Sequence, residues 1–233
     1  LVLGASLNWR EVSVLRAYAK YFKQVKFTFS QYYIEAALNN NHEITKSLVE
    51  LFHVRMSAKK NSNRLQQASE VKAKILISLD DVANLDEDKI IRYYISIIEA
   101  TLRTNFYQLD NNSQVKKYIS FKFNPTLIPD MPLPKPMFEI FVYSPQFEGV
   151  HLRAGKVARG GLRWSDRRED FRTEVLGLVK AQQVKNTVIV PVGAKGGFVC
   201  KQQHEKVGRD EIFEEGKSCY RIFIRSLLDI TDN

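Results

Sequence analysis

The chain has 233 residues, of which 44% are hydrophobic and 26% charged, with a formal net charge of +9 and an isoelectric point near 9.4. This composition indicates a globular protein of one or two domains and excludes a disordered or fibrous one. No apolar run approaches the roughly 20 residues of a membrane-spanning helix, so we expect no membrane span. Cys200 and Cys219 are too few to staple a fold of this size, and we expect a cytoplasmic protein.

Glycine and proline divide the chain, because both are disfavoured inside helices. Residues 1–123 contain one glycine and no proline, whereas residues 129–136 hold four prolines and residues 155–197 hold seven glycines. We therefore expect a helical segment over residues 1–110 and an α/β domain over residues 111–233. The first ten residues carry neither an initiator Met nor a signal-peptide pattern, which suggests an internal piece of a longer polypeptide.

Helical periodicity dominates the first half. Asn8 and Glu11 predict a capping box, and Leu15, Tyr18, Ala19 and Phe22 then follow at the spacing of one helix face. Asp86 precedes a second stripe that runs from Ile91 to Leu102. Further helices are expected over residues 31–38, 43–56 and 65–79. His42 and His53 have no second ligand at metal spacing, so they predict no metal site.

The period changes in the second half. Alternation and β-branched runs predict strands over residues 118–123, 138–143, 149–153 and 187–191. A helix is expected from Ser165 or Asp166 to about Lys185, and another from Asp210. The fold class is therefore mixed: a helical N-terminal part followed by a layered α/β domain.

Most of the positive charge lies in residues 150–201, where 11 Lys+Arg oppose 4 Asp+Glu. Two of these cations precede glycine pairs: Arg159 stands before Gly160 and Gly161, and Lys195 before Gly196 and Gly197. Paired glycines let the backbone approach a ligand closely, so a cation beside each pair is suited to holding a small anion.

A third cation is expected to face inward. On the helix that follows Asp170, the apolar stripe Phe171, Val175 and Leu178 reaches Lys185 two turns later. An inward lysine is costly unless it meets an anion, which is typical of a site. Four other basic residues are expected to be surface cations; they are Arg167, Arg168, Arg172 and Lys180.

The sequence motifs of several other chemistries are missing from the chain. The sequence contains no G-x-x-x-x-G-K-[ST] phosphate loop, no G-x-G-x-x-G dinucleotide fingerprint and no G-x-S-x-G nucleophile elbow. Its cysteines and histidines show no metal-binding spacing. We therefore expect neither a cofactor-binding residue nor a metal ligand in this chain.

Three motifs in order resemble one family. Arg159-Gly-Gly-Leu-Arg-Trp-Ser, Glu174-Val followed by Lys185, and Val190-Pro-Val-Gly-Ala-Lys-Gly-Gly look like the substrate-binding domain of amino-acid dehydrogenases. The longer sequence around these motifs is similar to that of the large-subunit, NAD-specific glutamate dehydrogenases of bacteria, and the similarity covers most of the chain.

The resemblance implies oxidative deamination of L-glutamate to 2-oxoglutarate and ammonia, with NAD bound by a nucleotide-binding domain that is not in this chain. It implies that Lys195 is the catalytic lysine, that Lys185 holds the α-carboxylate and that Arg159 holds the γ-carboxylate. Gly160 and Arg163 are implied to be substrate-binding as well. The family's catalytic aspartate is expected beyond Asn233. The parent enzyme is expected to be a homo-oligomer.

The chain differs in two ways from the motif pattern of the small-subunit glutamate dehydrogenases. Arg159 replaces a lysine, and the spacing from Lys185 to Lys195 is two residues shorter. An arginine can grip a carboxylate bidentately where a lysine offers a point charge.

Two other functions stay open. The basic segment could be a polyanion or nucleic-acid binding module, which would need cations and aromatic rings spread over an exposed surface. Phe171, Trp164 and Phe198 fall instead at apolar or turn positions, which disfavours nucleic acid as a partner. The N-terminal helices could also be a catalytically silent structural or regulatory part.

Overall fold

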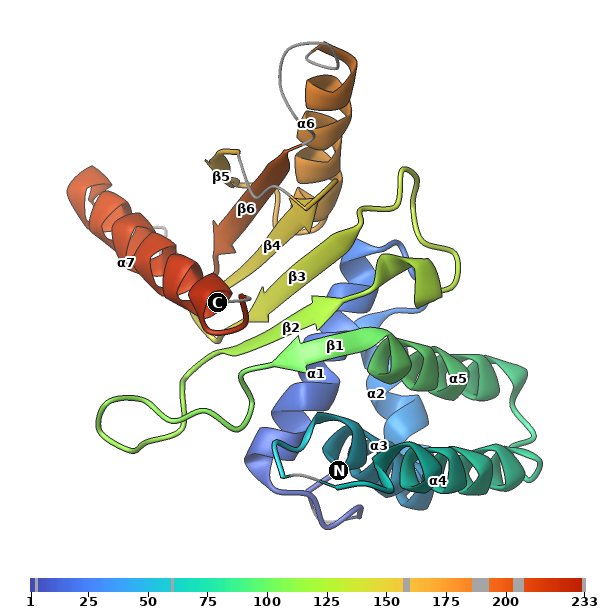
Figure 1. The fold of residues 1–233 in the computed structure, drawn as a ribbon. Coiled ribbons are helices and arrows are strands. Elements are labelled where there is room, and N and C mark those ends of the chain that lie inside the picture. Colours follow the sequence, from blue (N-terminus) through green and yellow to red (C-terminus); the bar gives the residue numbers. More distant parts are fainter. Residues whose placement is uncertain (3, 60, 157–159, 186–192, 203–207, 232–233) are drawn as a thin grey trace. The chain divides into compact units, whose positions relative to one another are not determined.

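The computed structural model describes residues 1–2, 4–59, 61–156, 160–185, 193–202 and 208–231 (Figure 1). The chain divides into two compact units. Unit 1 comprises Leu1–Thr101 and Leu127–Asp130, and unit 2 comprises Leu102–Thr126 and Met131–Asn233. The division at Thr101 falls before the expected boundary at residue 110.

Unit 1 is built from five helices (Figure 1). They are α1 (Trp9–Gln24), α2 (Gln31–Asn40), α3 (His42–Met56), α4 (Arg64–Leu79) and α5 (Leu85–Ala100). The capping box of α1 is confirmed: Asn8 Oδ1 accepts from the backbone N–H groups of Arg10 and Glu11, and the Glu11 carboxylate accepts from the Asn8 N–H. For α5 the cap is Asn84, so Asp86 lies inside the first turn instead.

Aromatic rings fill the interior of unit 1. Tyr18, Phe22 and Tyr94 are fully buried, and their rings meet edge to face at centroid distances of 4.8 to 6.5 Å. The predicted stripe of α1 is therefore the buried one. In the second predicted stripe, which α5 carries, Leu102 is an exception, because it belongs to a strand and is 43% exposed. The Thr101 hydroxyl donates to the Ile97 carbonyl, and its extended backbone ends α5 there.

Unit 2 contains one sheet of six strands. They are β1 (Thr101–Thr104), β2 (Ile119–Phe123), β3 (Phe138–Tyr143), β4 (Phe147–Arg153), β5 (Leu162–Trp164) and β6 (Ala194–Cys200). Their spatial order is β1-β2-β3-β4-β6-β5. Neighbours from β2 to β6 pair antiparallel, and β5 runs parallel to β6 at the edge.

Helices α6 (Phe171–Lys185) and α7 (Arg209–Leu228) cover opposite faces of this sheet (Figure 1). A Cβ added at Gly149 would meet Phe223 of α7, and one added at Gly197 would meet Val175 of α6. Because Gly149 pairs with Phe198, the neighbour of Gly197, these two directions are opposite. On the α7 face a core cluster includes Phe147, Phe198, Phe223 and both cysteines, which are free thiols.

The expected fold class is confirmed: a helical N-terminal part precedes an α/β layer. Strands β2, β3 and β4 lie where alternation predicts them, whereas β1, β5 and β6 were not predicted. The strand expected over residues 187–191 lies outside the described residues. None of the described helices is long and apolar enough to cross a membrane.

Helix α6 begins at Phe171 and not at Ser165 or Asp166. The Ser165 N–H donates to the Phe198 carbonyl, so the backbone at Ser165 still continues the edge of the sheet. The Ser165 hydroxyl accepts from the Arg167 N–H, which holds a turn ahead of the helix.

Candidate functional site

The two glycine motifs lie against each other at the edge of the sheet. Gly161 immediately precedes β5, and its carbonyl accepts a 3.2 Å hydrogen bond from the Gly196 N–H of β6. In the parallel register Leu162 pairs with Gly196, and Arg163 pairs with Gly197. Segments that are more than 30 residues apart in the sequence are therefore adjacent in unit 2.

Close backbone approach explains the glycine at position 160. A Cβ added there would lie 1.4 Å from the Ala194 carbonyl oxygen, directly before Lys195. No side chain fits between two backbones at that distance, so any larger residue must displace one of the segments. Gly160 thus brings the first motif against the beginning of β6.

Lys195 points to the face of the sheet that α6 covers. It pairs with Leu152, which pairs in turn with Glu139, so the three residues form one row across β6, β4 and β3. Arg172 of α6 reaches Glu139, which places the helix on this face. Lys195 itself is half-buried. Its position fits a lysine that meets a ligand at the end of the sheet next to Gly160.

The Arg172–Glu139 pair corrects a prediction. Arg172, expected to be a surface cation, has a side chain that is 0% exposed, as has Glu139. Its Nε and Nη2 donate to the two carboxylate oxygens at 2.6 and 2.7 Å. A buried charge needs such a partner, and glutamate at a buried strand position supplies it. Sequence periodicity missed the pair because each residue alone looks like a solvated one.

The inward stripe of α6 also differs from the prediction. Leu178 is 40% exposed, whereas Phe171, Val175 and Val179 are buried. The buried face is therefore rotated, because it follows Arg172, Leu176 and Val179 and not Leu178. The phase argument that turned Lys185 inward loses its premise.

The convergence of three cations stays a prediction. Arg159 lies outside the described residues, and Lys185 is the last residue of α6 with its side chain outside what is described. Gly160 and Lys195 are placed together, as given above. Arg163 is 56% exposed, and its Nε donates to the Glu174 carboxylate at 3.1 Å.

Glu174 accepts a second hydrogen bond. The Ser165 hydroxyl donates to its other carboxylate oxygen at 2.5 Å. Glu174 lies in the first turn of α6, while Arg163 and Ser165 flank Trp164 at the end of β5. One carboxylate thus ties the first motif to the helix that carries the second.

His151 is a half-buried polar residue that sequence reasoning did not select. It pairs with Gly196 across β4 and β6, and its ring lies against that glycine. Burial, together with the charge of Arg153, lowers the pKa of His151 to about 4. Its Nδ1 has no hydrogen-bond partner among the described residues. The sequence could have pointed to His151 through its position in a predicted strand, between Val150 and Leu152.

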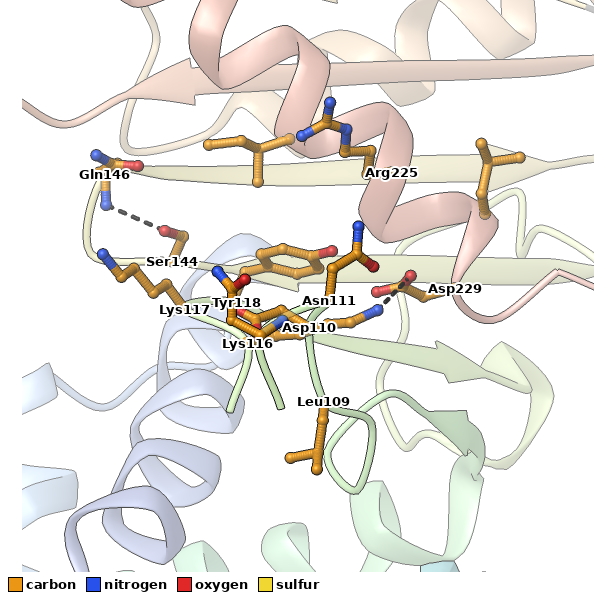
Figure 2. A pocket seen from close by; sticks show the side chains of 13 residues that line it. Leu109, Asp110, Asn111, Lys116, Lys117, Tyr118, Ser144, Gln146, Arg225 and Asp229 are labelled. Atoms are coloured by element: carbon orange, nitrogen blue, oxygen red, sulfur yellow. Dashed lines mark hydrogen bonds and ion pairs between the residues drawn. The ribbon is translucent and has the colours of Figure 1, made fainter. Parts of the chain in front are cut away.

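A separate hollow of about 680 Å³ lies between the segment 109–118 and the end of α7 (Figure 2). Lys116 and Asp229 face each other there, with Nζ 2.6 Å from the carboxylate. Burial and the Asp229 charge raise the pKa of Tyr118, whose ring also lines the hollow. None of its lining residues belongs to the three motifs, and its acidic and basic groups nearly balance. Within the described parts of the chain, no group of three His, Cys, Asp or Glu could hold a metal ion.

The described site is therefore a half-buried lysine in one glycine-rich segment, adjacent to a second such segment, on an α/β layer. Two family models match the chain: the catalytic domain of bacterial NAD-glutamate dehydrogenase over residues 74–233, and helical motif 3 of glutamate dehydrogenase over residues 1–58. The chain belongs to the bacterial NAD-glutamate dehydrogenase family.

Three relatives are each called NAD-specific glutamate dehydrogenase. The chain is 60% identical to the protein of Pseudomonas aeruginosa, 55% to that of Halomonas elongata and 52% to that of Mycobacterium tuberculosis. Each comparison covers 100% of this chain but only 14 to 15% of the relative. The chain thus spans about one seventh of the length of these relatives.

Proposed function

We propose that this chain forms the glutamate-binding part of an NAD-dependent glutamate dehydrogenase. The observation that carries the proposal is the contact of Gly160 with Ala194 and of Gly161 with Gly196, on either side of Lys195 in β6. Family membership supports the same chemistry. The substrate would be L-glutamate and the products 2-oxoglutarate and ammonia.

In this proposal the cations divide the work. Arg159 and Lys185 bind the γ- and α-carboxylates and fix the orientation of Cα. Lys195 takes a proton from the water that adds to the substrate imine, and returns protons as ammonia leaves. Gly160 would contact the substrate through its backbone, because the missing side chain lets this segment lie directly against Ala194.

NAD would accept the hydride from Cα when bound. The 233 residues contain no dinucleotide fingerprint, so we assign NAD to no residue of this chain. The nucleotide would be held by another part of the whole enzyme. We further propose that the whole enzyme is cytoplasmic and homo-oligomeric, and that it does not bind nucleic acid.

The described ion pairs support the proposal that the enzyme does not bind nucleic acid. Arg163, Arg167 and Arg172 each pair with a carboxylate of the same unit. Phe171 and Phe198 are buried, so they are not available for stacking on bases.

Two free, buried cysteines are compatible with a reducing compartment.

The proposal is tested on the whole enzyme by NADH formation from glutamate. Lys195→Ala should lower kcat by about 100-fold or more, the usual effect of removing an acid/base group. Lys180→Ala, on the exposed side of α6, is the matched control and should retain wild-type turnover. Equal kcat in wild type and Lys195→Ala would exclude the assigned role.

A second measurement uses the 233-residue chain alone. It should form no NADH and show no submicromolar NAD affinity, because we assign the binding of NAD to another part of the whole enzyme. Turnover above background would show that a nucleotide site lies within these residues.

A further inference from the structure

Two of the three sequence motifs meet at one carboxylate, that of Glu174. Glu174 accepts from Arg163 Nε at 3.1 Å and from Ser165 Oγ at 2.5 Å, and its side chain is 18% exposed. Arg163 and Ser165 lie at the end of β5, the strand that begins directly after Gly160 and Gly161. The position of the first glycine pair therefore depends on how β5 is held.

The residue after Glu174 completes the junction. Val175 is fully buried, and its Cγ2 would lie 2.5 Å from a Cβ added at Gly197. Gly197 is the second glycine of the Ala-Lys-Gly-Gly motif and pairs with Arg163. The first turn of α6 thus touches both motif strands, and the same helix ends at Lys185.

We propose that Glu174 is a positioning residue for the dicarboxylate site, acting through Arg163 and Ser165. A carboxylate has two oxygens and can satisfy both donors at once. This fixes β5 on α6 and sets the distance between the glycine segment that follows Arg159 and the helix that ends at Lys185. Arg163 is thereby a partner of Glu174 and not a substrate ligand. The inference rests on the proposed function.

The test measures KM and kcat for glutamate on the whole enzyme. Glu174→Gln keeps the size of the side chain but loses the charge and one acceptor oxygen. We expect KM to rise about tenfold, because two carboxylate-binding groups held at a wrong distance lose binding energy. The change in kcat should be smaller, since Lys195 is placed by β6.

A double-mutant cycle separates positioning from a general loss of stability. Arg163→Gln should raise KM by a similar factor, and the Glu174→Gln/Arg163→Gln variant should be no worse than the worse single variant. Ser165→Ala removes only one of the two bonds and should raise KM about threefold. It remains informative if Glu174→Gln does not fold.

Asp170→Asn is the matched control. Asp170 pairs with Arg167, four residues from Arg163, and both of these side chains are more exposed than Glu174. Its KM should equal that of the wild type.

Three results would overturn the inference: a wild-type KM in Glu174→Gln and Ser165→Ala, additive effects in the cycle, or the same KM rise in Asp170→Asn. If the wild-type enzyme itself forms no NADH from glutamate, the proposed function fails, and that outcome is separate from any variant.

Discussion

Both units bury neutral polar groups, but the fully buried ion pair among the described residues lies in unit 2. In unit 1, Tyr18 meets the Thr101 hydroxyl at 3.0 Å, and Tyr94 donates to the Leu15 carbonyl at 3.0 Å. These neutral bonds lie among aromatic rings. In unit 2, the fully buried Arg172–Glu139 pair joins α6 to β3, and His151 lies within β4.

The two interiors differ in what their buried groups contribute: stability in unit 1 and a fixed geometry in unit 2. Neutral hydroxyls contribute little net energy, so the aromatic packing of unit 1 carries its stability. A buried ion pair costs desolvation energy and is weak evidence for stability, but it fixes one geometry because either charge alone is strongly unfavourable. Among the residues that the structure describes, the unit that holds Lys195 is the one with a fully buried ion pair.

The largest effect is expected from the buried pair. Arg172→Ala should destabilise unit 2 by about 3–5 kcal/mol, because Glu139 is left charged without a partner. Denaturant titration with hydrogen exchange in β3 and α6 measures this loss. Arg167→Ala, which breaks an exposed pair, should have little effect.

A compensating double change sharpens the comparison. Arg172→Met combined with Glu139→Leu should recover most of the lost stability, since both charges are then gone. A double variant as unstable as Arg172→Ala would show that packing, and not the unpaired charge, dominates at this position.

The next effect depends on pH. His151 has a folded-state pKa of about 4, below the ordinary value of 6.5, so the unfolded chain binds its proton first. The contribution of His151 to the free energy of unfolding is then fully present above pH 6.5. It is lost as the pH falls toward 4, by up to about 3 kcal/mol. His151→Leu should flatten the unfolding free energy in this window, as measured by urea titration. His42→Asn, at an exposed site, should retain the wild-type slope.

The smallest effect is expected in unit 1. The Thr101 hydroxyl donates to Ile97, so the Tyr18 hydroxyl is the donor in their shared bond. Tyr18→Phe leaves Thr101 with its other partner and should cost about 1 kcal/mol. A loss as large as that of Arg172→Ala would contradict the contrast between the two interiors.

Helices were predictable where one face is apolar and a cap precedes it. Asn8 and Glu11 marked the beginning of α1, and α2, α3 and α4 begin within one residue of the expected positions. Strand β6 was missed because Ala194-Lys-Gly-Gly reads as a loop. Leu162 of β5 and Val175 of α6 occupy the space that the missing side chains of Gly196 and Gly197 leave, which sequence periodicity cannot reveal.

The site was predictable as a set of motifs but not as a geometry. Glycine pairs beside Arg159 and Lys195 indicated close backbone approach, and Gly160 lies against Ala194 accordingly. The roles of Glu174 and Arg172 depend on partners 9 to 33 residues away, so no local pattern shows them. The rotation of α6 relative to the predicted stripe has the same origin, because Arg172, expected at the surface, lies on the buried face of the helix.

The parallel register of β5 and β6 limits how relatives can differ in length. One residue inserted between Gly160 and Trp164 would turn each following side chain of β5 to the opposite face and would separate Gly161 from Gly196. Insertions and deletions should therefore collect in residues 154–159 and 186–193. The two-residue difference from the small-subunit pattern falls between Lys185 and Lys195. Family-wide gaps inside residues 160–164 would be incompatible with this strand pairing.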